Sequence, residues 1–203
     1  LDQEAVDRIL QKRGQADVVI ARHILEHAHN LSEFMACVAA LARPGGYVMY
    51  EVPDCTLALD KLDITTLWEE HIAYFTPATY RATVSMNGCE LVSYDCHPYP
   101  FENCLVAVCR TSSAKEPQFP NSSVLETELL RGKSFASGLP GKKRDGRSAL
   151  EKFRATRGKI ALFGAGHLAC TWVHLLGLRD LIEFVADDNP NKLGLFLPGG
   201  RLP

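Results

Sequence analysis

Short apolar runs alternate with helical periodicities in the first half of this chain, and this order of elements limits the folds open to it. The runs ADVVIA (16–21) and YVMYEVP (47–53) are mainly β-branched, aromatic or otherwise apolar, as expected of strands covered on both faces. Residues 1–13 and 31–41 instead carry apolar side chains at helical spacing. The order helix, strand, helix, strand predicts an α/β fold with a mostly parallel sheet.

An antiparallel pair is expected to close this sheet. TPATYRATVSMNG (76–88) suits a helix with proline in its first turn and glycine at its end. The apolar runs ELVSYD (90–95) and CLVAVCR (104–110) follow as two strands, joined across two prolines. Residues 1–112 are therefore predicted to form one sheet domain.

Composition divides the rest of the chain into a linker and a second, smaller domain. Residues 111–123 and 132–148 are rich in Gly, Pro, Ser and charge, which is typical of connectors. Residues 113–157 are therefore predicted to be a linker with helical segments. From 158 to 203, the order strand, glycine loop, helix, strand predicts a small, incomplete Rossmann-like α/β domain.

Charge and hydropathy restrict the partners. The formal net charge of -2 and the absence of a basic stripe interleaved with aromatic residues argue against a nucleic-acid partner. No run approaches the roughly 18 to 20 apolar residues that cross a bilayer, and the N-terminal residues lack the order of a signal peptide. We expect a cytoplasmic protein without membrane contact, and the sequence leaves its oligomeric state open.

The seven cysteines form no C-x-x-C pair. The spacing typical of a zinc site or a redox dithiol is missing, so no metal site is predicted. A free cysteine packs as a small apolar side chain. We therefore expect reduced and mostly buried thiols.

Residues 16–53 resemble the fourth strand, the following helix and the fifth strand of class I S-adenosylmethionine-dependent methyltransferases. Residues 43–46, Arg-Pro-Gly-Gly, stand where these enzymes end the helix with proline and glycines. In this family the loop after the fourth strand faces the cofactor. The resemblance thus implies that S-adenosylmethionine lies near Ala21, Arg22 and His23.

Two parts of the family pattern are expected upstream of Leu1. They are the glycine-rich first loop and the acidic residue after the second strand, which hold the methionine part and the ribose of the cofactor. We expect this chain to be cut at both ends, and to bind the cofactor poorly by itself. A second interpretation gives His27 and His29 no part in cofactor binding. In it they cap or pack around the junction of strand and helix.

The segment DITTLWEEHIAYFT (63–76) places two carboxylates, an imidazole and a phenol within six residues. Histidine titrates near neutral pH and a neighbouring carboxylate can orient it, so the group suits general base catalysis. The segment resembles the Tyr-x-Glu-His of sugar C-methyltransferases, in which the histidine is thought to help remove a proton from a carbon beside a ketone. That resemblance implies catalytic roles for His71, Glu70 and Tyr74.

The same segment departs from the family pattern. Trp68 stands in the place of the family's tyrosine, and Glu69 in a place where another histidine is common. The family's later His-Gly-Gly-Ser is also absent, because PYPFEN follows His97. A second interpretation therefore stays open, in which His71 and Tyr74 form the entry to the next helix, as in many methyltransferases that act on oxygen.

KIALFGAGHLA (159–169) combines an apolar strand, a Gly-x-Gly-x-x-Ala loop and the start of a helix, and Asp187 follows Gly166 by 21 positions. Such glycines permit a tight turn and the close approach of a phosphate to the helix N-terminus, and the acid can bind a ribose hydroxyl. Alone, this pattern predicts NAD binding. Alternatively, the glycines serve only close packing of strand and helix.

Residues 159–203 also resemble the C-terminal domain of the C-methyltransferase family. The resemblance rests on an Asp-x-Asn-Pro-x-Lys-x-Gly turn and on a Leu-Pro-Gly motif near the end of the stretch. That domain is Rossmann-like, has no established redox cofactor and helps to enclose a nucleotide-linked sugar. The residues that the resemblance assigns to substrate binding are Gly164, Ala165, Gly166, His167, Asp187, Asn189 and Lys192.

Three hypotheses of function follow. The favoured one is transfer of a methyl group from S-adenosylmethionine to a carbon, or with less support an oxygen, of a nucleotide-linked sugar or related glycan precursor. The second is an NAD-binding oxidoreductase that uses the loop at 164–166. The third is a catalytically degenerate binding module.

Overall fold

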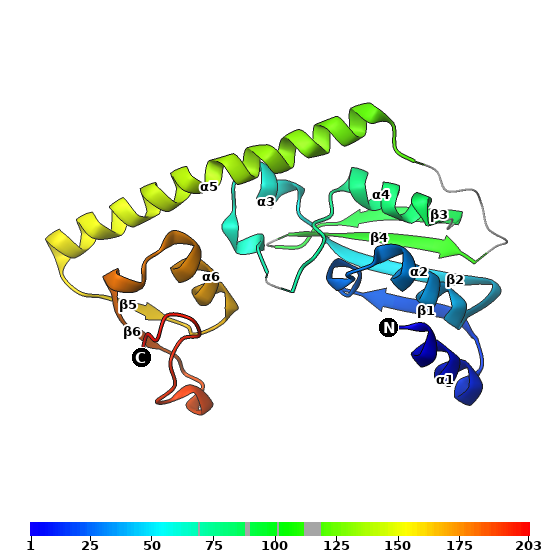
Figure 1. The fold of residues 1–203 in the computed structure, drawn as a ribbon, viewed down its shortest axis with the longest axis horizontal. Coiled ribbons are helices and arrows are strands. Elements are labelled where there is room, and N and C mark those ends of the chain that lie inside the picture. Colours follow the sequence, from blue (N-terminus) through cyan, green and yellow to red (C-terminus); the bar gives the residue numbers. More distant parts are fainter. Residues whose placement is uncertain (69, 88–89, 101, 112–118) are drawn as a thin grey trace. The chain divides into compact units, whose positions relative to one another are not determined.

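The computed structural model describes residues 1–68, 70–87, 90–100, 102–111 and 119–203. Glu69, the predicted helix-ending Gly88 and residues 112–118, which include the start of the predicted linker, lie outside the described residues. The chain divides into two compact units (Figure 1). The first unit comprises Leu1–Leu57 and Glu69–Arg131, and the second Ala58–Trp68 and Gly132–Pro203.

The first unit contains a four-stranded mixed sheet in the order β1-β2-β4-β3. Strands β1 (Ala16–Arg22) and β2 (Ala42–Asp54) are parallel. Strand β4 (Asn103–Arg110) runs antiparallel to β2, and β3 (Glu90–His97) antiparallel to β4. The predicted α/β class and the predicted antiparallel end of the sheet are both confirmed.

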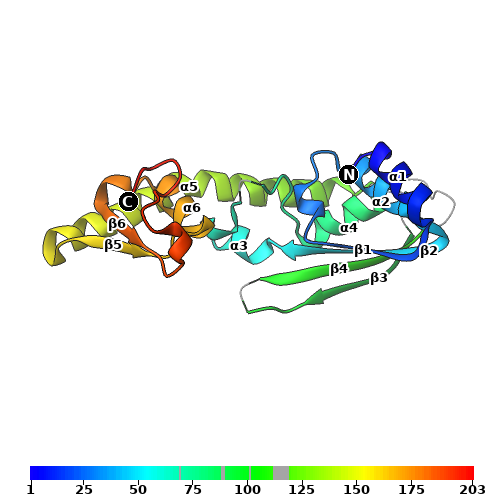
Figure 2. The ribbon, with the colours of Figure 1, turned by 90° about the horizontal axis from the view of Figure 1, so that it is seen from below.

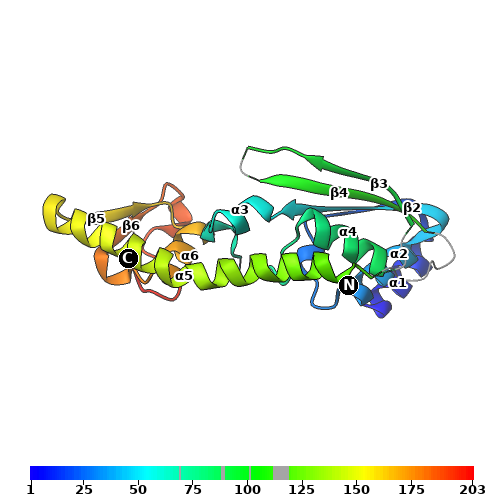
Figure 3. The same cartoon turned by 90° about the horizontal axis from the view of Figure 1, so that it is seen from above.

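Three helices lie on one face of this sheet, as the two opposite views in Figures 2 and 3 show. They are α1 (Gln3–Arg13), α2 (Leu31–Leu41) and α4 (Pro77–Met86). The Asn30 side chain caps α2 by accepting a hydrogen bond from the backbone N–H of Glu33, and Thr76 caps α4 in a capping box. Each cap satisfies a backbone donor that the helix itself leaves unpaired.

The core of the first unit lies between these helices and the sheet. Its largest fully buried side chains include Leu25, Met35, Tyr50, Tyr80 and Leu105. The Tyr80 hydroxyl donates a hydrogen bond of 2.8 Å to the backbone carbonyl of Tyr50, which satisfies this buried polar group. The turn after β1 contains Leu25 in a 3-10 helix, η1 (Leu25–His27), so the core holds the position of this turn.

The second unit contains two parallel strands and a helix between them: β5 (Ile160–Phe163), α6 (His167–Leu176) and β6 (Ile182–Ala186). The predicted order strand, helix, strand is confirmed. The short helical segments of this unit are η2 (Ile64–Thr66), η3 (Arg179–Leu181) and η4 (Pro190–Lys192). The boundary between the two units falls within the short helix α3 (Thr56–Asp60).

One long helix, α5 (Ser122–Arg157), occupies most of the predicted linker. The stretch 132–148, expected to be a connector, is part of this helix. Tertiary contacts within the second unit override its low helix propensity. Arg147 donates to the carboxylate of Asp180 and to the carbonyl of Gly177, and Arg154 pairs with Glu183. No helix among the described residues is long and apolar enough to cross a membrane.

Candidate functional site

Polar side chains converge at one end of the sheet in the first unit. The carboxyl ends of the parallel strands β1 and β2 meet there, and the antiparallel strand β4 begins beside them. Ligands collect outside the carboxyl ends of parallel strands. The predicted cofactor residues Ala21, Arg22 and His23 stand at this end, where Ala21 is buried in the core and the other two side chains are exposed.

Arg22 and His23 both bind the carboxylate of Glu51 on the neighbouring strand. The Arg22 guanidinium donates two hydrogen bonds, from Nε to Oε2 at 2.7 Å and from Nη2 to Oε1 at 2.9 Å. The Nε2 atom of His23 lies 3.1 Å from Oε1. These contacts, above all the hydrogen bond from Arg22, hold the pKa of Glu51 below its ordinary value, so this carboxylate is ionised at neutral pH.

The backbone of His23 takes a conformation that few side chains adopt. Its φ is +47°, in the left-handed region, and its N–H donates a hydrogen bond of 2.9 Å to the carbonyl of Glu51. A non-glycine residue held in this region often marks a functional position, because the surrounding structure must maintain the strain. The imidazole of His23 lies beside Glu51 of β2.

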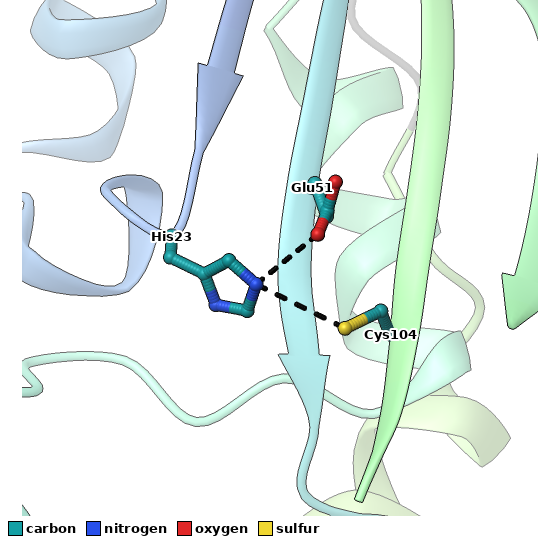
Figure 4. A group of neighbouring side chains, drawn as sticks. All are labelled: His23, Glu51 and Cys104. Atoms are coloured by element: carbon teal, nitrogen blue, oxygen red, sulfur yellow. Dashed lines mark hydrogen bonds and ion pairs between the residues drawn. The ribbon is translucent and has the colours of Figure 1, made fainter. Parts of the chain in front are cut away.

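Cys104, near the start of β4, completes this group. Its Sγ lies 3.9 Å from Nε2 of His23, and Figure 4 shows the three side chains pointing toward one another from the turn after β1, from β2 and from β4. Burial, followed by the charge of Glu51, raises the pKa of the Cys104 thiol. A cavity of about 260 Å³ adjoins the group and is lined by Arg22, His23, Glu51, Tyr99, Pro100, Glu102 and Cys104.

Glu26 joins this group to a second one. This residue is 1 % exposed, and its Oε1 lies 3.6 Å from Nδ1 of His23. Its Oε2 is buried and has no hydrogen-bond partner among the described residues. Burial raises the pKa of this carboxyl group, which makes the ionised form costly.

His71 lies on the other side of Glu26. Its ring is edge-on to the ring of His27, with centroids 4.8 Å apart, and 5.9 Å from the ring of Tyr74. Ligand atoms of Glu26, His27 and His71 lie within 4.8 Å of one another. The structure therefore brings the predicted catalytic His71 and Tyr74 together with a buried carboxyl group and a second imidazole.

Backbone contacts hold the segment that carries His71. The carbonyl of Glu26 accepts hydrogen bonds from Ile72 and Ala73, at 2.8 and 3.0 Å. Nδ1 of His27 lies 3.0 Å from the carbonyl of Glu70, so Glu70 contacts this group through its backbone, while its side chain is exposed. Such an arrangement can position an imidazole for proton transfer.

Sequence reasoning missed Glu26, Glu51 and Cys104, and one of its interpretations gave His27 a packing role. Their positions in the chain are far apart, and only the pairing of β1, β2 and β4 brings them together. A signal for Glu51 was present, because an acidic residue near the end of an apolar strand is unusual. Glu26 carried no such signal, since its burial depends on the turn after β1.

The predicted substrate loop lies in the second unit. Gly164 has φ +99° and Gly166 caps α6, and a Cβ atom built at either glycine would meet no atom within 4 Å. Close packing of strand against helix therefore does not require these two glycines. The carboxylate of Asp187 accepts a hydrogen bond of 2.7 Å from the backbone N–H of Ala165. One donor of the loop is thus already bound by the acid that the dinucleotide pattern assigns to a ribose.

The remaining predicted substrate residues also have partners within the second unit. Lys192 lies 2.8 Å from Asp187, and the Asn189 side chain accepts a hydrogen bond from the N–H of Asn191. The His167 ring stacks on Trp68 with centroids 3.8 Å apart. Trp68, where the C-methyltransferase pattern has tyrosine, therefore packs in the second unit.

Two protein families match this chain in sequence. Residues 1–94 match the family described as methyltransferase domain, and residues 125–203 match the C-methyltransferase C-terminal domain. The chain joins a methyltransferase domain to a C-methyltransferase C-terminal domain. The second match begins at residue 125 and so includes most of α5.

A curated relative resembles the chain over both domains. The C-methyltransferase NovU of Streptomyces niveus is 23% identical over 208 residues, which cover 98% of this chain and 50% of that protein. The chain thus spans about half the length of the curated relative that it matches.

Solved structures overlap parts of the chain. Magnesium protoporphyrin IX methyltransferase from Synechocystis PCC 6803, with bound SAH, is 20% identical with a TM-score of 0.38, over 48% of this chain and 46% of that one. The N-methyltransferase NodS from Bradyrhizobium japonicum WM9 is 12% identical with a TM-score of 0.36, over 55% and 70% respectively.

Proposed function

We propose that the whole protein transfers the methyl group of S-adenosylmethionine to a carbon of a nucleotide-linked sugar or a related glycan precursor. The observation that carries this proposal is the presence of both domain types, aligned with a C-methyltransferase along nearly the whole chain. That domain pair supports a carbon acceptor, and an oxygen acceptor has less support. The activity is proposed for the whole protein, because this chain aligns with only 50% of the length of the relative.

The residues at the end of β1 fit the sulfonium end of the cofactor. Glu51 is held ionised by Arg22, and the buried Glu26 has an oxygen without a partner among the described residues. Carboxylates in a partly buried site attract a sulfonium and an ammonium group. Ala21, Arg22 and His23 would hold this part of S-adenosylmethionine, which when bound supplies an electrophilic methyl group.

His71 is the proposed base. Its imidazole takes a proton from the acceptor carbon beside a carbonyl group, and the electron pair of that C–H bond becomes the nucleophile. His27, Tyr74 and the segment held by the Glu26 carbonyl keep the imidazole in place. The main contribution of the site is alignment, because methyl transfer gains most from holding the nucleophile near attack distance.

The loop at 164–167 is the proposed cradle for the diphosphate of the acceptor. Support comes from the open space beside Gly164 and Gly166 and from the start of α6 at His167, where backbone N–H groups can bind an anion. The hydrogen bond from Ala165 to Asp187 leaves the following N–H groups for the ligand. Asp187 is engaged within the turn, which favours a substrate phosphate over a nicotinamide dinucleotide at this loop.

The proposed base is tested in the full-length enzyme with labelled S-adenosylmethionine and a nucleotide-linked ketosugar. His71→Gln should lower turnover at least tenfold, since general base catalysis contributes about 10² to 10⁴ in rate. The matched control is His97→Gln, which replaces an exposed histidine on β3 and should keep turnover within twofold. Unchanged turnover of His71→Gln would remove this residue as the base.

A further inference from the structure

Residues 58–68 lie between two parts of the first unit in the chain, but they fold as part of the second unit. Ile64, in η2, is buried and belongs to the hydrophobic core of the second unit. Leu62 packs over α5 at Gly138, where a Cβ atom would lie 2.8 Å from the Leu62 side chain. The proposed base, His71, therefore closely follows a stretch whose position the second unit determines.

The end of this stretch contacts one side chain of α6, that of His167. The Trp68 ring stacks on the His167 ring, with centroids 3.8 Å apart and planes inclined by 15°. Nε2 of His167 also lies 3.2 Å from the carbonyl oxygen of Leu67. A carbonyl oxygen only accepts, so this hydrogen bond requires a ring hydrogen on Nε2. His167 thus holds two successive residues, one by a polar contact and the other by a ring contact.

The chain after His71 is held within the first unit. The N–H groups of Ile72 and Ala73 donate to the carbonyl of Glu26, at 2.8 and 3.0 Å. His71 lies three positions after Trp68 and one before Ile72, so contacts fix the chain on both sides of it. Misplacement of a reacting group by about 1 Å can slow a reaction about 10²-fold. Release of the chain on either side is therefore expected to slow proton removal.

We propose that Trp68 is a positioning residue for His71, and that its stack on His167 keeps the base aligned with the acceptor carbon. Trp68 acts through His71 and takes no part in the chemical step. This role rests on the proposed function of His71. Trp68 replaces the tyrosine of the C-methyltransferase pattern, and an indole ring offers a larger face for such a stack.

Steady-state kinetics of the full-length enzyme, with labelled S-adenosylmethionine and a nucleotide-linked ketosugar, test this role. Trp68→Ala should lower kcat about tenfold or more, since it releases the chain before the base, and should change the KM for the acceptor less than about twofold. Trp68→Phe keeps a ring for the stack and should recover most of kcat. The matched control is Phe153→Ala, which removes a ring of similar exposure from the second unit, 50 % against 42 % for Trp68. This control should leave kcat unchanged.

The stoichiometry of S-adenosylhomocysteine binding counts the folded molecules, so that kcat refers to them alone. A wild-type kcat in Trp68→Ala would overturn the role. An unchanged kcat with a raised KM for the acceptor would also overturn it, because Trp68 would then bind the acceptor.

A double variant separates a positioning role from a general effect on the fold. The effects of two residues that act as a unit are not additive. Because His71→Gln already lacks the base, adding Trp68→Ala should lower kcat less than about threefold further. A loss of the same size in both backgrounds would show that Trp68 acts independently of His71, and would overturn the proposal.

Hydrogen exchange followed by mass spectrometry reads the position of the segment without catalysis. In the full-length enzyme, Trp68→Ala should speed exchange in the peptides that contain His71, because local opening becomes easier there. Phe153→Ala should not change it. Unchanged exchange of these peptides in Trp68→Ala would overturn the role.

Failure of the proposed function gives a different result. Full turnover of His71→Gln would remove the base, and the role of Trp68 with it. A loss of turnover in His71→Gln together with wild-type turnover in Trp68→Ala would overturn the role of Trp68 alone.

Discussion

The two units place polar residues at the ends of parallel strands, but they use them differently. In the second unit Asp187 binds the N–H of Ala165, which comes from the loop before α6, and the ammonium of Lys192 in its own turn. In the first unit Glu51 binds Arg22 and His23, which come from the preceding strand and the turn after it, and one oxygen of Glu26 has no partner among the described residues. A carboxylate with all its partners stabilises a loop, whereas a buried unpaired group costs stability and is typical of functional sites.

The largest expected effects on stability come from substitutions in the hydrophobic cores of the two units. Leu25→Ala and Leu178→Ala each truncate a fully buried leucine, and each should lower the free energy of unfolding by about 2 to 5 kcal/mol. Leu25 lies in the turn that carries Glu26, and Leu178 in the second core. Hydrogen exchange followed by mass spectrometry should show faster exchange mainly in the unit that contains the change. Equal acceleration in both units would contradict the view that each unit has its own core.

Two carboxyl groups should respond to pH with opposite signs. Hydrogen bonds from Lys192, Ala165 and Asn189 lower the pKa of Asp187 to about 2. Its stabilisation is therefore present above the unfolded pKa, near 3.9, and is lost as the pH falls toward 2. Asp187→Asn should lower Tm by a few degrees at pH 6 and hardly change it at pH 2. Equal losses at both pH values would show that the charge is unimportant.

Glu26 provides the reverse case. Burial raises its pKa, so its ionised form destabilises the fold above the folded pKa, and this cost is absent below the unfolded value near 4.3. Glu26→Gln should raise Tm by a few degrees at pH 8 and change it little at pH 4. A lower Tm for Glu26→Gln than for the wild type at pH 8 would mean that the Glu26 carboxylate is well paired.

The smallest effects are expected at the two loop glycines. Gly164→Ala forces a side chain into φ +99° and should cost about 1 to 2 kcal/mol. Gly166→Ala places a methyl group in open space at φ -100° and should change stability by less than about 0.5 kcal/mol. Calorimetric titration with a nucleotide-linked sugar should nevertheless show weaker binding to Gly166→Ala. Unchanged binding would restrict the loop to a structural role.

Much of the fold could be predicted from the sequence, because local patterns decided it. The apolar runs, the Asn30 and Thr76 caps and the antiparallel end all follow from short-range signals. The stretch 132–148 could not be predicted, since its glycines and Pro140 disfavour a helix. Contacts from Arg147 and Arg154 to residues more than 25 positions later hold it helical.

The candidate site was predictable only in part. His23 and His71 stand in recognisable segments, and the structure places both beside Glu26. Glu51 and Cys104 join them through strand pairing, which residue spacing does not reveal. The strained φ of His23 is likewise set by the turn around it rather than by its own preference.

Hydrogen exchange at the acceptor carbon tests the central claim most directly, because it separates proton removal from methyl transfer. The full-length enzyme, given a nucleotide-linked ketosugar in D₂O with S-adenosylhomocysteine in place of the methyl donor, should incorporate deuterium beside the carbonyl without methylation. His71→Gln should slow this exchange at least tenfold, and His97→Gln should not. Exchange at the same rate in His71→Gln, or no exchange in the wild type, would contradict the account.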